Sequence, residues 1–506
     1  MSAYAFDAAR WAVPVTGIIW LPGLIALAGA LLAMFADMAG RTRLGLKAVA
    51  LGLTGAVVLT FGNALYGVAE PDKAFSVVFK VLVGGGSFAG MACVVFGTAL
   101  LAVSTGLHSI AEPRRVPVAV LIAFSATACQ VLMGAGDVLV LFLALEMVAL
   151  AGYALVSSAG TDRSDEAAMR YFVLGAVSTG LFAYGIAVLV GGHAGFSLAS
   201  DLYSAVAADS GPMAILPFVL ILAAMAFKAG AFPFHAWAPD VYETAPPGAV
   251  AFLAAGPKAA VITALVIVYG RSFWAQEAFT DAHVLIGVMA AGSIIYGNLA
   301  ALRQHDVGRM LGYSGIAQVG YALIGVTVGV PSVTLLAASY AMAVAIAFAC
   351  VEVYRRIDPG WDGTIAGLAG AGRRSPSVAF AMTVAMLSLT GIPLTAGFVG
   401  KFFVFFNAVQ SGLVWLVIIG GIGSVVSFGY YGRVIRALYL DEEREASPEA
   451  DDAEPTGVYT RAVEVDPAGE RRPRVWPAVV TAVVVLAIGT LPLAYGFAGL
   501  MRFFGV

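Results

Sequence analysis

Long apolar runs fill most of the 506-residue chain, and short segments with charges or with Pro and Gly separate them. Most runs reach the roughly 20 residues that a helix needs to cross a bilayer. A β-barrel shows short alternating segments instead, so the pattern predicts an all-α polytopic membrane protein with about 14 transmembrane helices. The predicted spans are 14–36, 46–68, 76–107, 116–134, 138–158, 168–191, 213–234, 247–270, 282–302, 308–329, 332–354, 376–409, 412–438 and 475–503.

Composition supports this class and excludes several functions. The chain is 60% hydrophobic and only 12% charged, with a mean hydropathy of +0.91, whereas a soluble domain is about 45–50% apolar and about 25% charged. The three cysteines lie in apolar runs without CxxC spacing or a neighbouring histidine, and the sequence has no P-loop, dinucleotide or HExxH motif. We therefore expect no metal, no cofactor and no nucleic-acid partner on this chain.

Basic residues test the number of spans, because cytoplasmic loops of membrane proteins collect Lys and Arg. With fourteen spans, the odd-to-even connections hold twenty of the 28 basic residues, and the opposite side, with both termini, holds five. This sorting predicts a multi-pass protein of the cell inner (plasma) membrane with both termini on the outer side. The first apolar run exceeds a signal-peptide core of roughly 7–15 residues, so we expect it to be a span.

One segment breaks the apolar pattern. Residues 441–475 begin DEEREASPEADDAEPTG and are polar, acidic at first and poor in aromatic residues. This composition is typical of a mobile loop, predicted here on the cytoplasmic side before a C-terminal transmembrane helix within 476–506. A tolerated insertion without a function of its own is the simpler interpretation of the loop.

Four ionisable residues lie inside predicted spans. Lys228, Lys258 and Lys401 are the basic residues that belong to neither side, and Glu146 lies near the middle of the fifth span. A lysine near the bilayer centre costs about 2.5–3.5 kcal/mol on insertion scales, so such residues are functional candidates. The alternative is a snorkelling side chain or a charge that only pairs with another. Three lysines and a glutamate together favour the functional interpretation.

Two of these lysines lie beside predicted helix interruptions. Pro233, in AFKAGAFPFHAW, cannot donate to the carbonyl one turn earlier, so the seventh span should break just after Lys228. The twelfth span contains LTGIPLTAGFVGKFFVF and, at about 34 residues, is too long for one straight crossing, so it should form two half-helices that break ahead of Lys401. Paired interruptions in two halves point to an ion site in a transporter built from repeats. Proline kinks that serve only packing are the alternative.

The matching interruptions predict the domain organisation. We expect an N-terminal three-helix segment over 1–112, a first five-helix repeat over 113–272 and a second over 273–440. An odd number of helices per repeat inverts the second unit relative to the first, so helices 4–8 and 9–13 form two inverted repeats.

Six stretches of sequence are specific enough to indicate a family. They are LFLALEMVALAGYALV, EAAMRYFVLGAVSTGLFAYGIAVLVG, FKAGAFPFHAWAPDVYETAP, FLAAGPKAAVITALV, LRQHDVGRMLGYSGIAQVGY and GIPLTAGFVGKFFVF. In this order they resemble subunit N of the proton-pumping NADH:quinone oxidoreductase, respiratory complex I. The PFHAWAPDVYE and GPKAA stretches favour subunit N over its sister antiporter-like subunits and over multisubunit sodium/proton antiporters.

The resemblance implies roles for the four buried charges. Glu146 matches the glutamate of the fifth helix, Lys228 the lysine of the interrupted seventh, Lys258 the central lysine of the eighth and Lys401 the lysine of the twelfth. Together they would form a mid-membrane proton relay driven by redox chemistry in other subunits. Flavin, iron–sulfur clusters and quinone are expected on those partners, with no redox catalysis on this chain. The expected partners are the lipid bilayer and other membrane-arm subunits, including sister antiporter-like subunits.

The sequence departs from the family at two positions of the tenth span. Gly308 stands where a lysine is usual, and Gln318 stands where a histidine is common. Because glutamine cannot titrate, this part of the relay would depend on water or on Tyr313. The 441–475 loop is also longer and more acidic than the resemblance implies.

A charge pair would make such a relay switchable. Two unit charges about 4 Å apart interact by roughly 4 kcal/mol at an effective dielectric near 20, so separating Glu146 from Lys228 would release a proton towards Lys258 and then Lys401. His235, just after the seventh-span break, is a candidate entry residue, although a loop histidine without a role is the simpler interpretation. The alternatives for the whole chain are a stand-alone cation/proton antiporter of the same fold and a structural subunit whose buried charges only pair.

Overall fold

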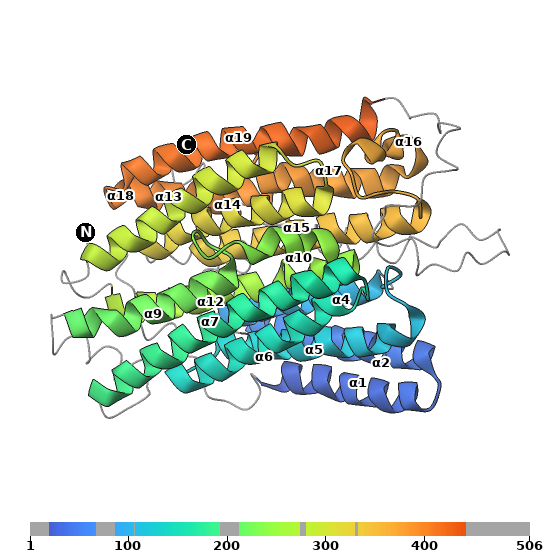
Figure 1. Ribbon diagram of the computed structural model, residues 1–506, viewed down its shortest axis with the longest axis horizontal. Helices are drawn as coiled ribbons and strands as arrows, with labels where there is room; N and C mark the ends of the chain where they lie inside the picture. Colours follow the sequence, from blue (N-terminus) through green and yellow to red (C-terminus); the bar gives the residue numbers. More distant parts are fainter. Residues whose placement is uncertain are drawn as a thin grey trace.

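The computed structural model describes residues 20–66, 87–105, 107–192, 212–273, 280–328 and 332–441. Secondary structure within them is helical, apart from a single antiparallel bridge between Asp306 and Thr364. The helices run side by side in one elongated bundle, with α1 and α19 at opposite edges (Figure 1). The all-α, polytopic prediction is confirmed. The helices are α1 (Leu21–Met38), α2 (Thr42–Tyr66), α4 (Ser87–Ser104), α5 (Glu112–Met133), α6 (Val138–Ser157), α7 (Asp162–Gly192), α9 (Pro212–Ala229), α10 (Trp237–Thr244), α11 (Pro247–Leu253), α12 (Gly256–Phe273), α13 (Thr280–Leu302), α14 (Val307–Val328), α15 (Ser332–Ile357), α16 (Ala371–Arg374), α17 (Pro376–Thr390), α18 (Ala396–Gln410) and α19 (Val414–Tyr439), with a 3-10 turn, η4, at Ala366–Leu368.

The helices match the predicted spans within a few residues over most of the chain. Ten of the described helical stretches are long and apolar enough to cross a membrane, and α4, α9, α17 and α18 carry shorter apolar stretches. The α11–α12 stretch and the helices α14 and α15 are buried almost throughout, whereas α1, α7 and α19 bury about a third of their apolar window. The bundle therefore has its core around α11, α12, α14 and α15. The predicted last span, the 441–475 loop after its first residue, and both termini lie outside the described residues.

The seventh span is interrupted where the sequence predicts it. Helix α9 ends at Ala229, and Gly230 takes a left-handed conformation, with φ of +76°, that glycine adopts without strain. The indole of Trp237 then donates to the carbonyl oxygen of Phe227 at 2.9 Å. Because this carbonyl is one of those that a helix end leaves free, Trp237 stabilises the break that Pro233 initiates.

The twelfth span is also interrupted as predicted. Helix α17 ends at Thr390, Gly391 has φ of +86°, and α18 starts at Ala396. The Thr395 hydroxyl caps α18 by accepting a hydrogen bond from the Phe398 N–H at 3.4 Å. The break thus leaves the last carbonyls of α17 open to a side chain.

The eighth span differs from its prediction as one continuous helix over 247–270. Helix α11 ends at Leu253, two turn residues follow, and α12 starts at Gly256. Pro257 accounts for the difference, because it has no N–H to donate to the Leu253 carbonyl and it fits the first turn of a new helix. As a result, Lys258 lies in the first turn of α12 rather than in the middle of a long helix.

A second buried carboxylate joins three parts of the bundle. Glu352, near the end of α15, is 1% exposed, and the sequence alone did not single it out. It accepts hydrogen bonds from the Ser109 N–H and hydroxyl, each at 2.7 Å, and from the Gly248 N–H at 3.0 Å. Three donors satisfy this carboxylate, so it fixes the α4–α5 loop and the start of α11 against α15.

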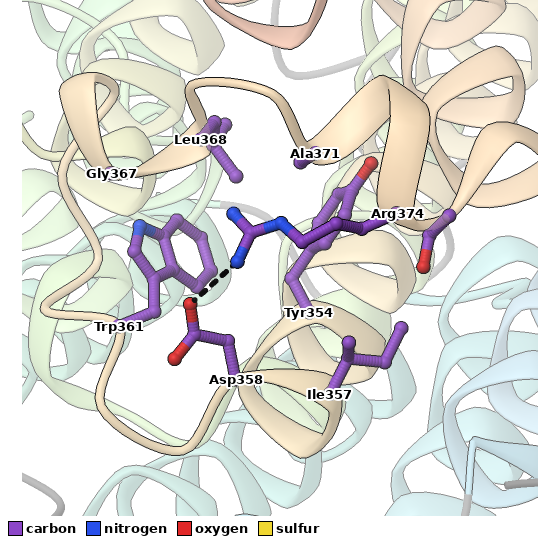
Figure 2. Close-up of a pocket in the computed structure, with 9 residues that line it drawn as sticks. Tyr354, Ile357, Asp358, Trp361, Gly367, Leu368, Ala371 and Arg374 are labelled. Carbon is purple, nitrogen blue, oxygen red and sulfur yellow. Dashed lines mark hydrogen bonds and ion pairs between the residues drawn. The ribbon is translucent and has the colours of Figure 1, made fainter. Parts of the chain in front are cut away.

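The connection between α15 and α17 folds into a compact cap. Figure 2 shows the Arg374 guanidinium between the side chains of Trp361 and Tyr354, with an ion pair to Asp358 at 3.3 Å. The cavity there has a volume of about 10 Å³. This is about the space of one water molecule, so the cap is a structural element rather than a ligand site.

Candidate functional site

The first part of the candidate site is an ion pair between α6 and α9. The Lys228 amine lies 3.5 Å from Oε1 of Glu146 and 3.5 Å from the Tyr153 hydroxyl. The same Glu146 oxygen accepts a hydrogen bond from the Thr179 hydroxyl of α7 at 2.8 Å. The lysine side chain is 5% exposed and the glutamate 22%. The predicted pair is therefore formed, with its carboxylate nearer to the outer face of the bundle.

The second part is Lys258, which lies at the centre of the bundle. Its side chain is 1% exposed, and its amine has no hydrogen-bond partner among the described residues. The amine faces the rings of Tyr242 and Tyr340, 5.0 and 5.9 Å from their centroids. A Cβ on Gly315 of α14 would lie 2.8 Å from this amine, so the glycine leaves it room. An ammonium buried without a carboxylate is costly, so its protonation responds strongly to nearby charge.

Polar side chains continue from this centre towards α18. The Tyr340 hydroxyl borders Gly315 together with the Lys258 amine. Next along α14, Ser314 is hydrogen-bonded to Tyr431 of α19, and Gln318 donates to the carbonyl oxygen of Leu389 at 2.6 Å. The sequence did not single out these tyrosines or this serine, because periodicity does not tell which side chains of different helices meet.

The third part is Lys401, which binds the open end of α17. Its amine donates to the carbonyl oxygens of Leu389 at 2.9 Å and Thr390 at 3.1 Å. The ring of Tyr321 lies beneath it, 4.3 Å from amine to centroid. The Leu389 carbonyl thus accepts from both Lys401 and Gln318. The helix break creates this site, because an intact helix would use these carbonyls itself.

The structure explains one of the two departures from the family. A Cβ on Gly308 would clash with the backbone carbonyl of Tyr242, so a lysine does not fit there. The other residue named at sequence level, Tyr313, does not lie between the lysines but has its ring 5.9 Å from the Arg309 guanidinium and 6.1 Å from the Tyr296 ring.

His235 lies in an aromatic stack rather than against the buried lysines. Its ring centroid is 4.4 Å from that of Tyr296 and 5.5 Å from that of Phe232. Through Tyr296 and Tyr313 the stack reaches Arg309 in the first turn of α14.

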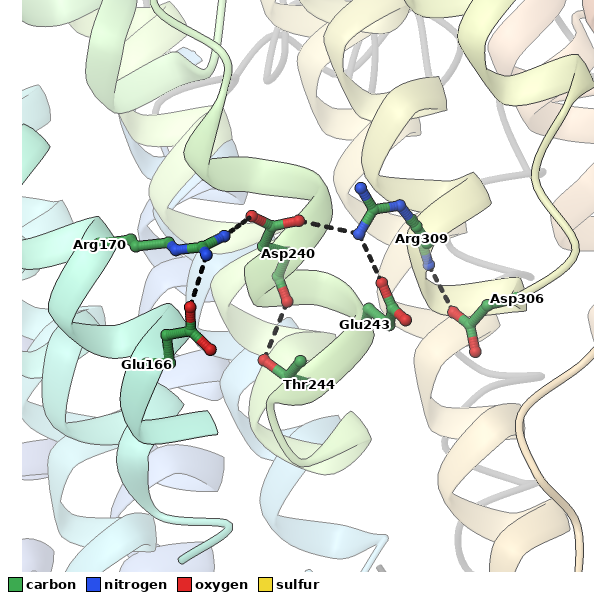
Figure 3. A network of polar contacts seen from close by, with 7 residues as sticks. All are labelled: Glu166, Arg170, Asp240, Glu243, Thr244, Asp306 and Arg309. Carbon is green, nitrogen blue, oxygen red and sulfur yellow. Dashed lines mark hydrogen bonds and ion pairs between the residues drawn. The ribbon is translucent and has the colours of Figure 1, made fainter. Parts of the chain in front are cut away.

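A charge network joins α7, α10 and α14 near the starts of α7 and α14 (Figure 3). Asp240 of α10 pairs with Arg170 of α7 at 3.1 Å and with Arg309 of α14 at 2.8 Å, and Glu243 pairs with the same Arg309 at 2.6 Å. Asp306 caps α14 by accepting from the Arg309 N–H at 2.7 Å. Burial raises the pKa of Asp306 to about 6, and Glu243 adds to the rise.

The network and the central lysine share one short helix. Asp240 and Glu243 of α10 face the arginines, while Tyr242 between them faces Lys258.

Asp137, the acidic residue just before α6, is an ordinary helix cap, which accepts a hydrogen bond from the Val140 N–H at 2.7 Å. Among the described residues no cluster of histidine, cysteine and acidic side chains could hold a metal ion.

Comparisons with known proteins identify the family. The model of the transmembrane region of NADH:quinone oxidoreductase and Mrp antiporter subunits matches residues 135–427. NADH-quinone oxidoreductase subunit N of Trichlorobacter lovleyi is 38% identical over 71% of this chain and 74% of its own, and subunit N 1 of Rhizobium meliloti is 36% identical over 84% and 88%.

Solved structures agree with this result. A chain of respiratory complex I from Thermus thermophilus has a TM-score of 0.69 at 25% identity and covers 93% of this chain and 97% of its own. A chain of the Mrp complex from a Dietzia species has a TM-score of 0.76 at 20% identity, with 96% and 98% covered, and shows the shared fold. The chain therefore belongs to the NADH:quinone oxidoreductase/Mrp antiporter family of membrane subunits, and within it to the group of subunit N.

Proposed function

We propose that this chain is a proton-translocating membrane-arm subunit of a complex I-type NADH:quinone oxidoreductase. Glu146, Lys228, Lys258 and Lys401 carry the proton, and partner subunits hold the flavin, iron–sulfur clusters and quinone. The main support is that three lysines are buried in α9, α12 and α18: the first pairs with Glu146 of α6, and polar side chains of α14, α15 and α19 lie between the other two. Subunit N relatives at 36–38% identity support the assignment to such a complex.

The ion pair is the proposed switch of the relay. At 3.5 Å and an effective dielectric near 20, its Coulomb energy is about 5 kcal/mol. A proton moved against 100 mV costs about 2.3 kcal/mol, so opening the pair changes the energy of Lys228 by more than one such step. Lys228 then passes its proton to Lys258, whose amine faces Tyr242 and Tyr340 and borders Gly315.

Between Lys258 and Lys401 the proton moves along side chains of α14, α15 and α19, without a titrating histidine. Tyr340, Ser314 and Tyr431 supply hydroxyls that donate and accept, and Gln318 holds the Leu389 carbonyl beside the Lys401 amine. Hydroxyl groups and water can pass a proton by exchange, because each can both donate and accept a hydrogen bond. Gln318 does not titrate, so its role is to orient the groups along the path. Lys401 receives the proton and exchanges it with one bulk phase.

Proton entry fits the surface network next to α10. Movement of Arg309 away from Asp240 and Glu243 would shift helix α10. Tyr242 belongs to the same helix, so its ring would move relative to the Lys258 amine. The stack of Tyr313, Tyr296 and His235 starts at the same arginine. In this proposal His235 is an entry residue, and Asp240 is a positioning residue.

The decisive experiment replaces the central lysine. Lys258→Ala in the assembled complex should lower protons pumped per NADH oxidised by at least tenfold, while assembly stays normal, because the substitution removes a buried, unpaired cation. Arg303→Gln, an exposed charge removed from the same chain, is the matched control and should pump normally. Unchanged pumping by the Lys258 variant would refute the relay.

A proteoliposome experiment separates the alternative functions. A stand-alone antiporter would exchange cations for protons as a purified single chain, driven by a gradient. A structural subunit would show normal pumping per assembled complex after substitution of Glu146 or Lys228, with only assembly impaired. Our proposal predicts no exchange by the single chain and defective pumping in the assembled variants.

A further inference from the structure

Three unpaired cations gather at the turn between α1 and α2. Arg41, Arg43 and Lys47 are exposed, and none has an ion pair or side-chain hydrogen bond to any described residue. Two acidic residues are close by: Glu112, at the start of α5, lines the same cleft, and Asp37 lies in the last turn of α1. The local charge is therefore +1, at the end of two helices that lie along the bundle (Figure 1).

These residues line a shallow, open cleft. Its volume is about 530 Å³, and its lining consists of Gly40, Arg41, Thr42, Arg43, Leu44, Lys47 and Glu112. The proposed relay and the charge network use none of these residues.

The cleft rests on a rigid hairpin. A Cβ on Gly29 of α1 would lie 2.9 Å from Cα of Gly52 of α2, so the two backbones are in close contact. The turn is held by the Gly40 N–H to the Asp37 carbonyl and the Arg41 N–H to the Ala36 carbonyl, each at 2.8 Å. The cations are thus attached to a fixed frame.

An exposed apolar surface runs from the cleft along both helices. On α1, Phe35 is 68% exposed and Met38 83%, and on α2, Leu44 is 50% exposed and Leu51 71%. Met38 precedes the turn and Leu44 lines the cleft itself. A cationic cleft above an apolar strip matches a molecule with an anionic head and hydrocarbon chains.

We propose that this cleft binds the headgroup of an anionic phospholipid, with the phosphate between Arg41, Arg43 and Lys47 and the acyl chains along α1 and α2. Charge complementarity favours this occupant over a neutral lipid, because basic residues at a membrane surface attract anionic headgroups. Arginine pairs well with phosphate oxygens through its two-pronged guanidinium. The site is independent of the proposed proton relay.

The experiment uses the whole complex that contains this chain, purified in mild detergent and placed in phosphatidylcholine nanodiscs with increasing phosphatidylglycerol. Native mass spectrometry counts the phosphatidylglycerol retained. We expect R41Q/R43Q/K47Q to retain one fewer tightly held lipid, with about 100-fold weaker binding from the loss of three surface charges. The matched control R163Q/R303Q/R373Q removes three exposed arginines outside the cleft and should retain the lipid.

A second variant tests the sign of the effect. Glu112→Gln removes the carboxylate of the cleft and should bind phosphatidylglycerol several-fold more tightly. Competition with millimolar inorganic phosphate should release none of the lipid, because the apolar surface contributes to binding. Equal retention by wild type and the triple variant, release by free phosphate alone, or loss of a protein chain instead of a lipid would each overturn the proposal.

Discussion

The two interrupted helices hold their lysines in different ways. Beside the first break, Lys228 pairs with the carboxylate of Glu146, which belongs to another helix. Beside the second, Lys401 binds two backbone carbonyls of α17, the first half of its own broken span. A carboxylate can lose its charge or move away, whereas a backbone carbonyl can do neither. The Lys228 site is therefore suited to a change in the charge of its partner. The Lys401 site is suited to keeping its amine in a fixed position.

The largest effect should come from breaking the switchable pair. Glu146→Gln or Lys228→Met alone leaves one buried charge unpaired, which costs about 3–5 kcal/mol, so assembly should fall severalfold and pumping at least tenfold. The double variant E146Q/K228M removes both charges and should recover assembly, measured as intact complex on a native gel. Pumping that recovers together with assembly would show that the pair is only structural.

Two glycines test the second site against the first. Gly391→Ala adds left-handed strain of about 1–2 kcal/mol, and its Cβ would lie 3.0 Å from Cδ of Lys401. Gly230→Ala adds similar strain, but the nearest atom would be 3.7 Å away. Pumping should therefore fall about fivefold in G391A and at most twofold in G230A, while both complexes lose similar thermal stability. Equal activity of the two variants would contradict a positioned Lys401.

Substitution of Gln318 tests whether the Lys401 site needs the Leu389 carbonyl that both side chains share. Gln318→Leu removes the donor to Leu389, and we expect a three- to fivefold loss of proton pumping. Gln318→His keeps a ring N–H donor and should retain at least half of the activity. If both variants pump normally, the path between Lys258 and Lys401 runs elsewhere.

The smallest effect concerns the surface network between the two halves. Since the folded pKa of Asp306 is raised to about 6, folding is favoured when this carboxyl is protonated. The ionised carboxylate of Asp306 therefore lowers the free energy of unfolding. This destabilisation is fully present above pH 6 and disappears as pH falls below 4. Asp306→Asn keeps a capping side chain, so the melting temperature of the complex should rise by a degree or two at pH 8 and by clearly less at pH 4.5. A variant equally stabilised at both pH values would exclude this titration.

Much of the fold could be predicted from the sequence, because each span has a local cause. Apolar runs set the helix positions, and Pro233 marked the first interruption. The glycines and proline ahead of Lys401 marked the second. The break in the eighth span was missed, although Pro257 signalled it, because the run of hydrophobic residues continues across it.

The candidate site was only partly predictable. A charge in an apolar run is visible without a structure, and this selected the glutamate and all three lysines. Their surroundings depend on which helices pack together, so Tyr242, Tyr340 and Tyr431 could not be selected among eighteen tyrosines. Glu352 was missed for another reason: its distance from a span end is typical of a boundary charge, and only packing buries it.

The unexpected break in the eighth span has an electrostatic consequence. Peptide dipoles align along a helix and give its N-terminus about half a positive charge and its C-terminus about half a negative one. Lys258 lies at the positive start of α12, and Lys401 is bound to the negative end of α17. The dipole of α12 therefore disfavours a positive charge on Lys258, and that of α17 favours one on Lys401.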